Sequence, residues 1–172
     1  MAKFEPAIEK ILELEGGFVD HPSDPGGATN FGISLRWLQT VGDYDRDDIK
    51  DMTAAQASAL YKEHWWDKHR YENIPDQLIA NKLFDMSVNM GPKQAHRLLQ
   101  RAMNSVLGKR TLKDDGILGP KTLQTLIMSA AAQPHALLSA LRAHQEGFYR
   151  LLVAQKPSFQ VFLEGWINRA VS

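Results

Sequence analysis

Apolar residues recur at helical spacing along most of this chain. Between Phe4 and Glu15 they stand at positions 4, 8, 11 and 12, which form one face of an α-helix. The same spacing predicts a short helix over 34–41 and longer helices over 53–69 and 75–89. The longer helix that opens at Thr53 also carries the capping-box pattern, with a glutamine three positions later.

Helical spacing returns in the second half of the chain. Helices are predicted after Gly91-Pro92, after Gly119-Pro120, over 134–155, and around Phe159 and Trp166. Proline suits the first helical turn, because the amide hydrogen that it lacks has no partner there. The segment 107–118 is expected to be a loop. The chain is therefore predicted to be mainly α.

The region that follows the first helix differs from the rest of the chain. Residues 16–33 hold five of the twelve glycines and two of the eight prolines. This composition ends a helix and is typical of turns, so we expect a small Gly-rich loop or β-hairpin here.

Glu15 stands in the middle of the apolar face of the first helix. At 100° per residue it lies about 20° from Phe4, among the apolar positions. The other carboxylates of this helix fall at roughly 100° to 180°, on the side expected to face solvent: Glu5, Glu9 and Glu13. Glu15 therefore differs from the other three glutamates in its angular position, because it lies on the apolar face of the helix.

Two effects act on the Glu15 carboxyl in the same direction. Burial disfavours the ionised form and raises the pKa, and the negative end of the helix dipole adds to this. A protonated carboxyl near neutral pH is what a general acid needs to protonate a glycosidic oxygen. A buried glutamate held by a salt bridge or by backbone amides fits the same pattern, so periodicity alone leaves both interpretations open.

A glycosidase needs a second group across the scissile bond. In an inverting enzyme the two carboxyl groups stand roughly 6.5 to 9.5 Å apart, with a water between them. Asp20, Asp24 and Thr29 lie in the Gly-rich segment, which must fold back near the end of the first helix. Asp24 is the leading partner, in the turn-forming stretch Ser23-Asp-Pro-Gly-Gly27.

Charge is distributed unevenly along the 172 residues. Residues 1–90 hold 9 Lys and Arg against 16 Asp and Glu, and residues 91–172 hold 11 against 4, so the halves carry −7 and +7. A basic half favours an anionic partner such as nucleic acid or a cell-wall polymer, although solvated helix faces give the same count.

Several chemistries lack their sequence signals. The chain has no cysteine, which excludes disulfides and thiolate catalysis, and it has no His-Glu-x-x-His motif, so we expect no metal and no other cofactor. No apolar run is long enough for stable membrane insertion. The amino terminus also lacks the apolar core of a secretory signal.

Longer stretches of the sequence resemble glycoside hydrolase family 108. These are "ELEGGFVDHPSDPGGATNFGIS", "YKEHWWDKHRYENIP", "FDMSVNMGPKQAHRLLQRAM", "DDGILGPKTLQTL" and "FLEGWINRA". The resemblance implies a lysozyme-like helical fold and a peptidoglycan N-acetylmuramidase, of the kind found in phage endolysins. It also implies a catalytic portion over 1–90 and a helical peptidoglycan-binding portion over 91–172 packed on it.

The resemblance also implies roles for individual residues. The glutamate of the family's Glu-Gly-Gly-Tyr marker corresponds to Glu15, the general acid, while Phe18 replaces the tyrosine and removes its hydroxyl. Phage lysozymes, which are similar in fold, use an Asp with eight intervening residues after the Glu, and a Thr with five intervening residues after the Asp. Asp24 keeps that first interval, and Thr29 comes one residue early.

Four further residues are candidates for binding the sugar chain. Asp85 and Asn89 are four apart, so they share one helix face, and they join Asn30 as polar groups suited to saccharide hydroxyls and acetamido groups. Trp66 offers a ring for stacking on a sugar. A helix-ending role for Asn89 and a core role for one tryptophan of the pair Trp65-Trp66 remain alternatives.

Three other functions remain open from the sequence. A lytic transglycosylase would cleave the same bond without water, and a non-catalytic peptidoglycan-binding protein would not need Glu15. A nucleic-acid-binding protein would use the basic half, but the acidic first half argues against it. We expect synthesis in the cytoplasm and action in the periplasm or cell wall, reached through a holin or another export partner. Oligomeric state is not predicted beyond a default monomer.

Overall fold

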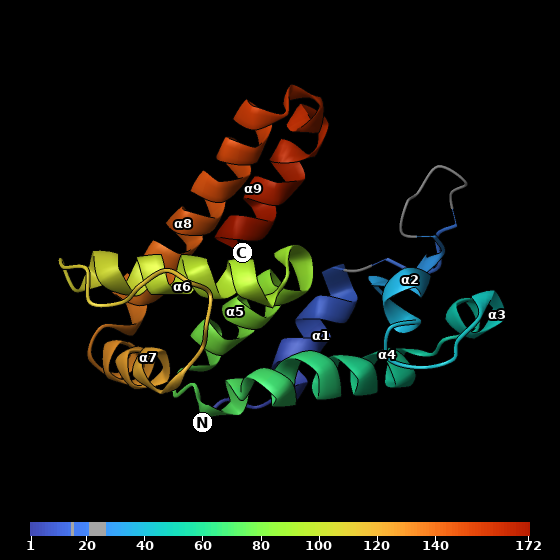
Figure 1. Cartoon of the computed structure of the whole chain (residues 1–172), viewed down its shortest axis with the longest axis horizontal. Helices are drawn as coiled ribbons and strands as arrows, with labels where there is room; N and C mark the ends of the chain where they lie inside the picture. The colour runs from blue at the N-terminus through green and yellow to red at the C-terminus, as the bar shows by residue number, and fades with distance from the viewer. Residues whose placement is uncertain (15, 21–26) are drawn as a thin grey trace. The chain divides into compact units, whose positions relative to one another are not determined.

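The computed structural model of the chain describes residues 1–14, 16–20 and 27–172 (Figure 1). Its contacts divide the chain into two compact units. The amino-terminal unit is Lys3–Lys68, and the carboxy-terminal unit combines Met1–Ala2 with His69–Ser172. Ala2 is part of the carboxy-terminal unit because its backbone N–H donates to the carbonyls of Glu72, at 3.1 Å, and Ile74, at 2.9 Å.

The amino-terminal unit begins with α1 (Glu5–Leu14), whose amphipathic pattern confirms the predicted helix. Phe4, Ile8 and Ile11 are buried. The three carboxylates of the described helix, Glu5, Glu9 and Glu13, are exposed. Burial of this apolar stripe is what holds α1 in the unit, because removing apolar surface from water is the main driving force for packing.

A small antiparallel hairpin follows α1. Strands β1 (Thr29–Asn30) and β2 (Ile33–Ser34) pair with Thr29 opposite Ser34 and Asn30 opposite Ile33. The two turn residues, Phe31 and Gly32, have φ angles of 48° and 75°, and a type I′ turn requires a positive φ at both positions. A mainly α fold with a small hairpin after the first helix is therefore confirmed.

Short helices complete the amino-terminal unit. They are α2 (Leu35–Leu38), α3 (Arg46–Lys50) and α4 (Ala54–Tyr61), and α4 continues without a break as the π-helix η1 (Lys62–Asp67). The predicted capping box is present, since the Thr53 and Gln56 side chains each accept a hydrogen bond from the other residue's backbone N–H. The hydroxyl of Tyr61 donates to the carbonyl of Phe31 at 3.0 Å and so holds the hairpin turn against α4.

The carboxy-terminal unit is helical. After the 3-10 turn η2 (Tyr71–Asn73) it contains α5 (Gln77–Met90), α6 (Pro92–Val106), α7 (Pro120–Ala132), α8 (Pro134–Gln155), the 3-10 segment η3 (Pro157–Phe162) and α9 (Leu163–Val171). Both predicted Gly-Pro starts are confirmed, and α8 has the predicted bounds. Residues 107–119 form the expected loop between α6 and α7.

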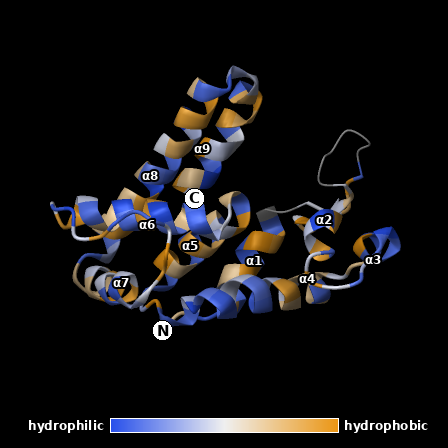
Figure 2. Cartoon of the chain, viewed as in Figure 1, coloured by the Kyte–Doolittle hydropathy of each residue, from blue (hydrophilic) through white to orange (hydrophobic). Residues whose placement is uncertain are grey.

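The core of this unit lies where α5, α6 and α8 pack on one another. It contains fully buried residues from each helix, among them Leu83 and Phe84 of α5, Leu99 of α6 and Leu141 of α8. Hydrophobic and hydrophilic residues interchange along these helices, as amphipathic packing requires (Figure 2). Helix α9 folds back along α8 and contacts it over much of its length (Figure 1).

Candidate functional site

Helix α1 leads directly to the residue predicted to be the general acid. Its last residue is Leu14, and Glu15 follows at the next position but lies outside the described residues. The apolar stripe that Glu15 continues in the sequence is buried at Phe4, Ile8 and Ile11, which are 8%, 6% and 0% exposed. The role of Glu15 stays a prediction that rests on this stripe and on the resemblance.

Two backbone hydrogen bonds join the described residues on either side of the segment 21–26, which follows Glu15 in the chain. The backbone N–H of Val19 donates to the carbonyl of Thr29, and the N–H of Thr29 donates to the carbonyl of Val19, each at 2.8 Å. This bridge places Val19 on the side of β1 opposite β2, and it closes the chain between positions 19 and 29. Asp24 belongs to that interval and lies outside the described residues, since 21–26 are not described.

Asp20 and Thr29 lie on either side of Asp24 in the sequence, in different surroundings. The Asp20 carboxylate forms an ion pair with the guanidinium of Arg46 in α3, so Asp20 links this segment to the rest of the amino-terminal unit. Thr29 is partly buried, and its hydroxyl is 3.5 Å from the carbonyl of Gly27. At this length the contact is weak, and the hydroxyl remains able to bind another group.

Asn30 supports α3 rather than offering its amide nitrogen to a ligand. The side chain is 4% exposed, and its nitrogen lies 2.9 Å from the carbonyl of Ile49, 3.3 Å from that of Lys50 and 3.4 Å from that of Met52. These carbonyls belong to the end of α3 and the residues after it, where helical partners run out. The observed contacts give Asn30 a structural role, and its contact with sugar stays a prediction.

The two adjacent tryptophans divide between core and surface. Trp66 is 2% exposed and packs edge-on against Phe4, with ring centroids 5.7 Å apart, so the residue chosen from the sequence for stacking on sugar is packed in the core. Trp65 is only half-buried, and its ring lies 4.6 Å from that of Trp37 and 5.2 Å from that of Tyr61. No local sequence signal points to Trp37, because its partner Trp65 is far along the chain.

Asp85 lies inside the carboxy-terminal unit and pairs with a cation from α9. Its Oδ1 accepts a hydrogen bond from the Nε of Arg169 at 2.8 Å, and its Oδ2 lies 4.0 Å from the Nζ of Lys82. Asp85 is 1% exposed, and its Oδ2 is buried without a hydrogen-bond partner among the described residues. This pairing fastens α5 to α9, and a sugar-binding role for Asp85 stays a prediction.

Asn89 shares a face with Asp85, as the spacing predicts, and this face also meets α8. The hydroxyl of Tyr149 donates to Asn89 Oδ1 at 2.6 Å and accepts from the amide of Gln145 at 2.9 Å. Burial raises the pKa of Tyr149, and the hydrogen bond from Gln145 opposes that shift. Asn89 remains exposed, so it combines this structural bond with access to solvent. A sugar contact for Asn89 stays a prediction.

A buried histidine joins η2, α6 and the 107–119 loop. The carbonyl of Gly116 accepts from Nδ1 of His96 at 3.3 Å, which places the ring proton on Nδ1 and leaves Nε2 to accept from the Tyr71 hydroxyl at 2.8 Å. Burial lowers the pKa of His96 to about 4, and the nearby His69 acts in the same direction. The neutral ring therefore fixes the loop at neutral pH.

No group of three or more metal-ligating side chains occurs among the described residues. In the same part of the chain, the helices are too short or too polar to span a membrane. The predicted residues Thr29, Asn30 and Trp66 belong to the amino-terminal unit, and Asp85 and Asn89 belong to the carboxy-terminal unit.

Two family models match adjacent parts of the chain. Residues 8–91 match the family described as glycosyl hydrolase 108, and residues 94–171 match one described as a predicted peptidoglycan domain. The chain belongs to glycosyl hydrolase family 108. It is therefore a glycoside hydrolase, and the second match supports peptidoglycan as the polymer that it hydrolyses.

A solved structure shares the fold over nearly the full chain. The structure of Brucella abortus SagA superposes with a TM-score of 0.77 at 27% sequence identity and covers 98% of this chain and 89% of SagA. The comparison with curated proteins finds no match. The boundary between the two family models lies near the predicted division at residue 90, whereas the compact units divide between Lys68 and His69. The functional division at residue 90 stays a prediction.

Proposed function

We propose that this family 108 enzyme hydrolyses the β-1,4 bond between N-acetylmuramic acid and N-acetylglucosamine, with Glu15 as the general acid. The observation that carries the proposal is the buried apolar stripe of α1 at Phe4, Ile8 and Ile11, the helix face that Glu15 continues in the sequence. A carboxyl that continues this stripe is shielded from water, and the carboxyl end of the helix disfavours its negative charge.

Asp24 is the leading candidate for the group that positions or activates water. The bridge between Val19 and Thr29 supports this role, because it limits how far the segment that carries Asp24 can extend. Asp20 is the weaker choice, since its carboxylate is engaged by Arg46. The partly free hydroxyl of Thr29 is a second polar group for the same water.

Trp65 and Trp37 are better suited than Trp66 to contact the sugar chain. Both rings are half-buried and lie 4.6 Å apart, so part of their aromatic surface faces solvent. The Nε1 of Trp65 is buried without a hydrogen-bond partner among the described residues, which leaves a donor for an acceptor that enters beside the ring. An aromatic ring with one free polar atom is suited to contact a sugar ring, whose surface is partly apolar and partly polar.

Mass spectrometry of digested peptidoglycan tests the chemistry. Products with reducing-end muramic acid support hydrolysis, and anhydromuramic acid would instead identify the lytic transglycosylase. Glu15→Gln should abolish product, while Glu13→Gln, two residues earlier on the exposed face, should leave it unchanged. Asp24→Asn should lower the rate more than Asp20→Asn does. Full activity of Glu15→Gln would refute its assignment as the acid.

A further inference from the structure

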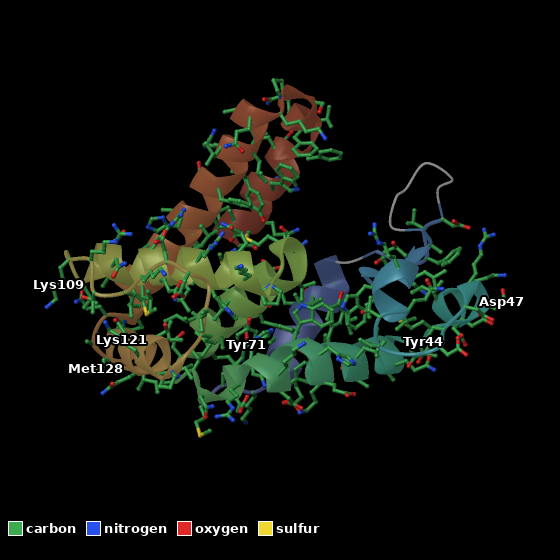
Figure 3. The ribbon with its side chains drawn as sticks, in the orientation of Figure 1. Tyr44, Asp47, Tyr71, Lys109, Lys121 and Met128 are labelled. Carbon is green, nitrogen blue, oxygen red and sulfur yellow. The ribbon has the colours of Figure 1, made fainter. Side chains whose placement is uncertain are left out.

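A pocket lies at one end of the carboxy-terminal unit, between the end of α6, the loop that follows it, and α7. Its volume is about 300 Å³, at the lower end of the range for small-molecule sites. The lining residues come from positions 106–111 and 125–133. In Figure 3 Lys109 and Met128, which both line the pocket, lie at the same end of this unit.

The walls of the pocket are mainly apolar, but they contain two unpaired hydroxyl groups. Val106, Leu107 and Met128 supply aliphatic surface. The hydroxyls of Thr111 and Ser129 are buried and have no hydrogen-bond partner among the described residues. Ser129 is 4% exposed as a whole residue.

A third hydroxyl in the pocket behaves differently. The hydroxyl of Thr125 donates to the carbonyl of Lys121 at 2.8 Å, as threonine in a helix usually does. Buried hydroxyls without partners are uncommon, because each loses its bonds to water on burial. Thr111 and Ser129 therefore mark a place where a ligand would supply the missing bonds.

The part of the loop that forms one wall of the pocket, around Thr111, is bound by the side chain of Asn104. The Oδ1 of Asn104 accepts from the backbone N–H groups of Thr111 and Leu112, each at 2.9 Å, and its amide donates to the carbonyl of Leu112 at 2.8 Å. These bonds fix the position of Thr111, so a ligand would meet a pocket that is already formed.

Charge at the pocket defines the ligand further. Lys109 is the one charged residue among those that line it, it is exposed, and it makes no ion pair in the described part of the chain. An ammonium group beside apolar walls and two hydroxyls is complementary to a small aliphatic group that carries a carboxylate and an adjacent polar atom.

We propose that this pocket binds a carboxylate attached to a methyl-bearing carbon. The carboxylate pairs with Lys109, the methyl group contacts the aliphatic wall, and the adjacent amide or ether bonds to Thr111 and Ser129. Murein offers this chemistry in two places: a stem peptide that ends in alanine, and the lactyl group of a muramic acid that has lost its stem. The choice of murein as the source rests on the proposed function.

Titration of the ¹⁵N-labelled full chain tests the proposal. N-acetyl-D-alanine represents the peptide end, and N-acetylmuramic acid represents the lactyl group. We expect at least one of them to cause saturable shifts confined to amides of 106–111 and 125–133, and the ligand that binds identifies the source. N-acetyl-D-alaninamide, which lacks the carboxylate, should bind at least about tenfold more weakly than N-acetyl-D-alanine if the peptide end is the source.

Single substitutions test each proposed contact between the pocket and the ligand. Lys109→Gln, Thr111→Val and Ser129→Ala should each weaken binding about three- to tenfold, and the last two should fold normally because they remove unpaired groups. Lys113→Gln, an exposed lysine on the same loop outside the pocket, should have no effect. Absence of localised shifts with both carboxylates, or equal weakening by Lys113→Gln, would overturn the proposal. Glu15→Gln should bind normally, so hydrolysis and pocket binding are judged separately.

Discussion

Val19 and Thr29 exchange two backbone hydrogen bonds of 2.8 Å and thereby close the segment that contains Asp24. Thr29→Pro removes one of these donors, so we expect at least about a hundredfold loss of peptidoglycan hydrolysis through misplacement of the segment. Thr29→Val keeps both backbone bonds and removes only the hydroxyl, and its activity should fall by no more than about tenfold. Turbidity loss of purified cell walls measures both. Equal activities for the two variants would show that the bridge does not position a catalytic group.

Substitution of Trp66 should lower stability, whereas substitution of Trp65 should weaken substrate binding. Trp66→Ala should lower the free energy of unfolding by about 3 to 5 kcal/mol, because it empties a core site beside Phe4. Trp65→Leu keeps an apolar side chain but loses the aromatic face, and its KM for soluble murein fragments should rise about three- to tenfold. Urea unfolding and steady-state kinetics measure the two effects. If Trp65→Leu leaves KM unchanged, the Trp65 ring does not contact the sugar chain.

The ion pair between Asp85 and Arg169 should be a major stabilising contact of the carboxy-terminal unit. Asp85→Ala leaves Arg169 and Lys82 without this carboxylate, and breaking such a buried pair costs about 3 to 5 kcal/mol. Replacing both partners, as Asp85→Ala with Arg169→Met, should recover part of that loss. The free energy of unfolding in urea tests both statements. A loss below about 1 kcal/mol for the single variant would contradict the role of the pair in joining α5 and α9.

Acid should destabilise the protein through His96. Its pKa falls from the ordinary 6.5 to about 4 on folding, mainly because the ring is buried. Between these values the unfolded chain binds a proton that the folded chain does not, so the free energy of unfolding falls as the pH falls from 6.5 to 4. The total loss from this group is roughly 3 kcal/mol, and the stabilisation is fully present above 6.5.

Histidine variants and NMR check this prediction. His96→Gln retains a donor for Gly116 and an acceptor for Tyr71, so it should fold but lose most of the pH dependence in this range. His135→Gln, at an exposed position, should behave as the wild type. Titration of the His96 ring signals gives its pKa directly. A midpoint near 6.5 would remove the basis of the prediction.

Local sequence signals were sufficient for most of the fold. Apolar spacing predicted α1 and α8, Gly-Pro pairs predicted the starts of α6 and α7, and the Thr53 capping box predicted the start of α4. Each of these signals acts between residues a few positions apart, so it can be recognised from the sequence without knowledge of tertiary contacts. The π-helical geometry of η1 has no such local signal and was not predicted.

Contacts between distant residues explain why individual site residues were harder to predict. Asp85 pairs with Arg169 across 84 positions, and Asn30 reaches the carbonyl of Ile49 across 19. Helical spacing correctly predicts that Asp85 and Asn89 share one face of α5. It does not predict that α9 packs over Asp85. The choice between Trp65 and Trp66 likewise depends on Phe4, whose position beside Trp66 of η1 is a tertiary property.

The hydrogen bonds from Ala2 to Glu72 and Ile74 have a consequence for chain connectivity. Since Met1–Ala2 belong with His69–Ser172, the amino-terminal unit is topologically an insertion, tethered to the carboxy-terminal unit at both of its ends. A single proteolytic cut between Lys68 and His69 therefore breaks one of these two connections and leaves the hydrogen bonds of Ala2 at the other end of residues 3–68. Expressed alone, residues 69–172 would lack the backbone donor that the carbonyls of Glu72 and Ile74 share.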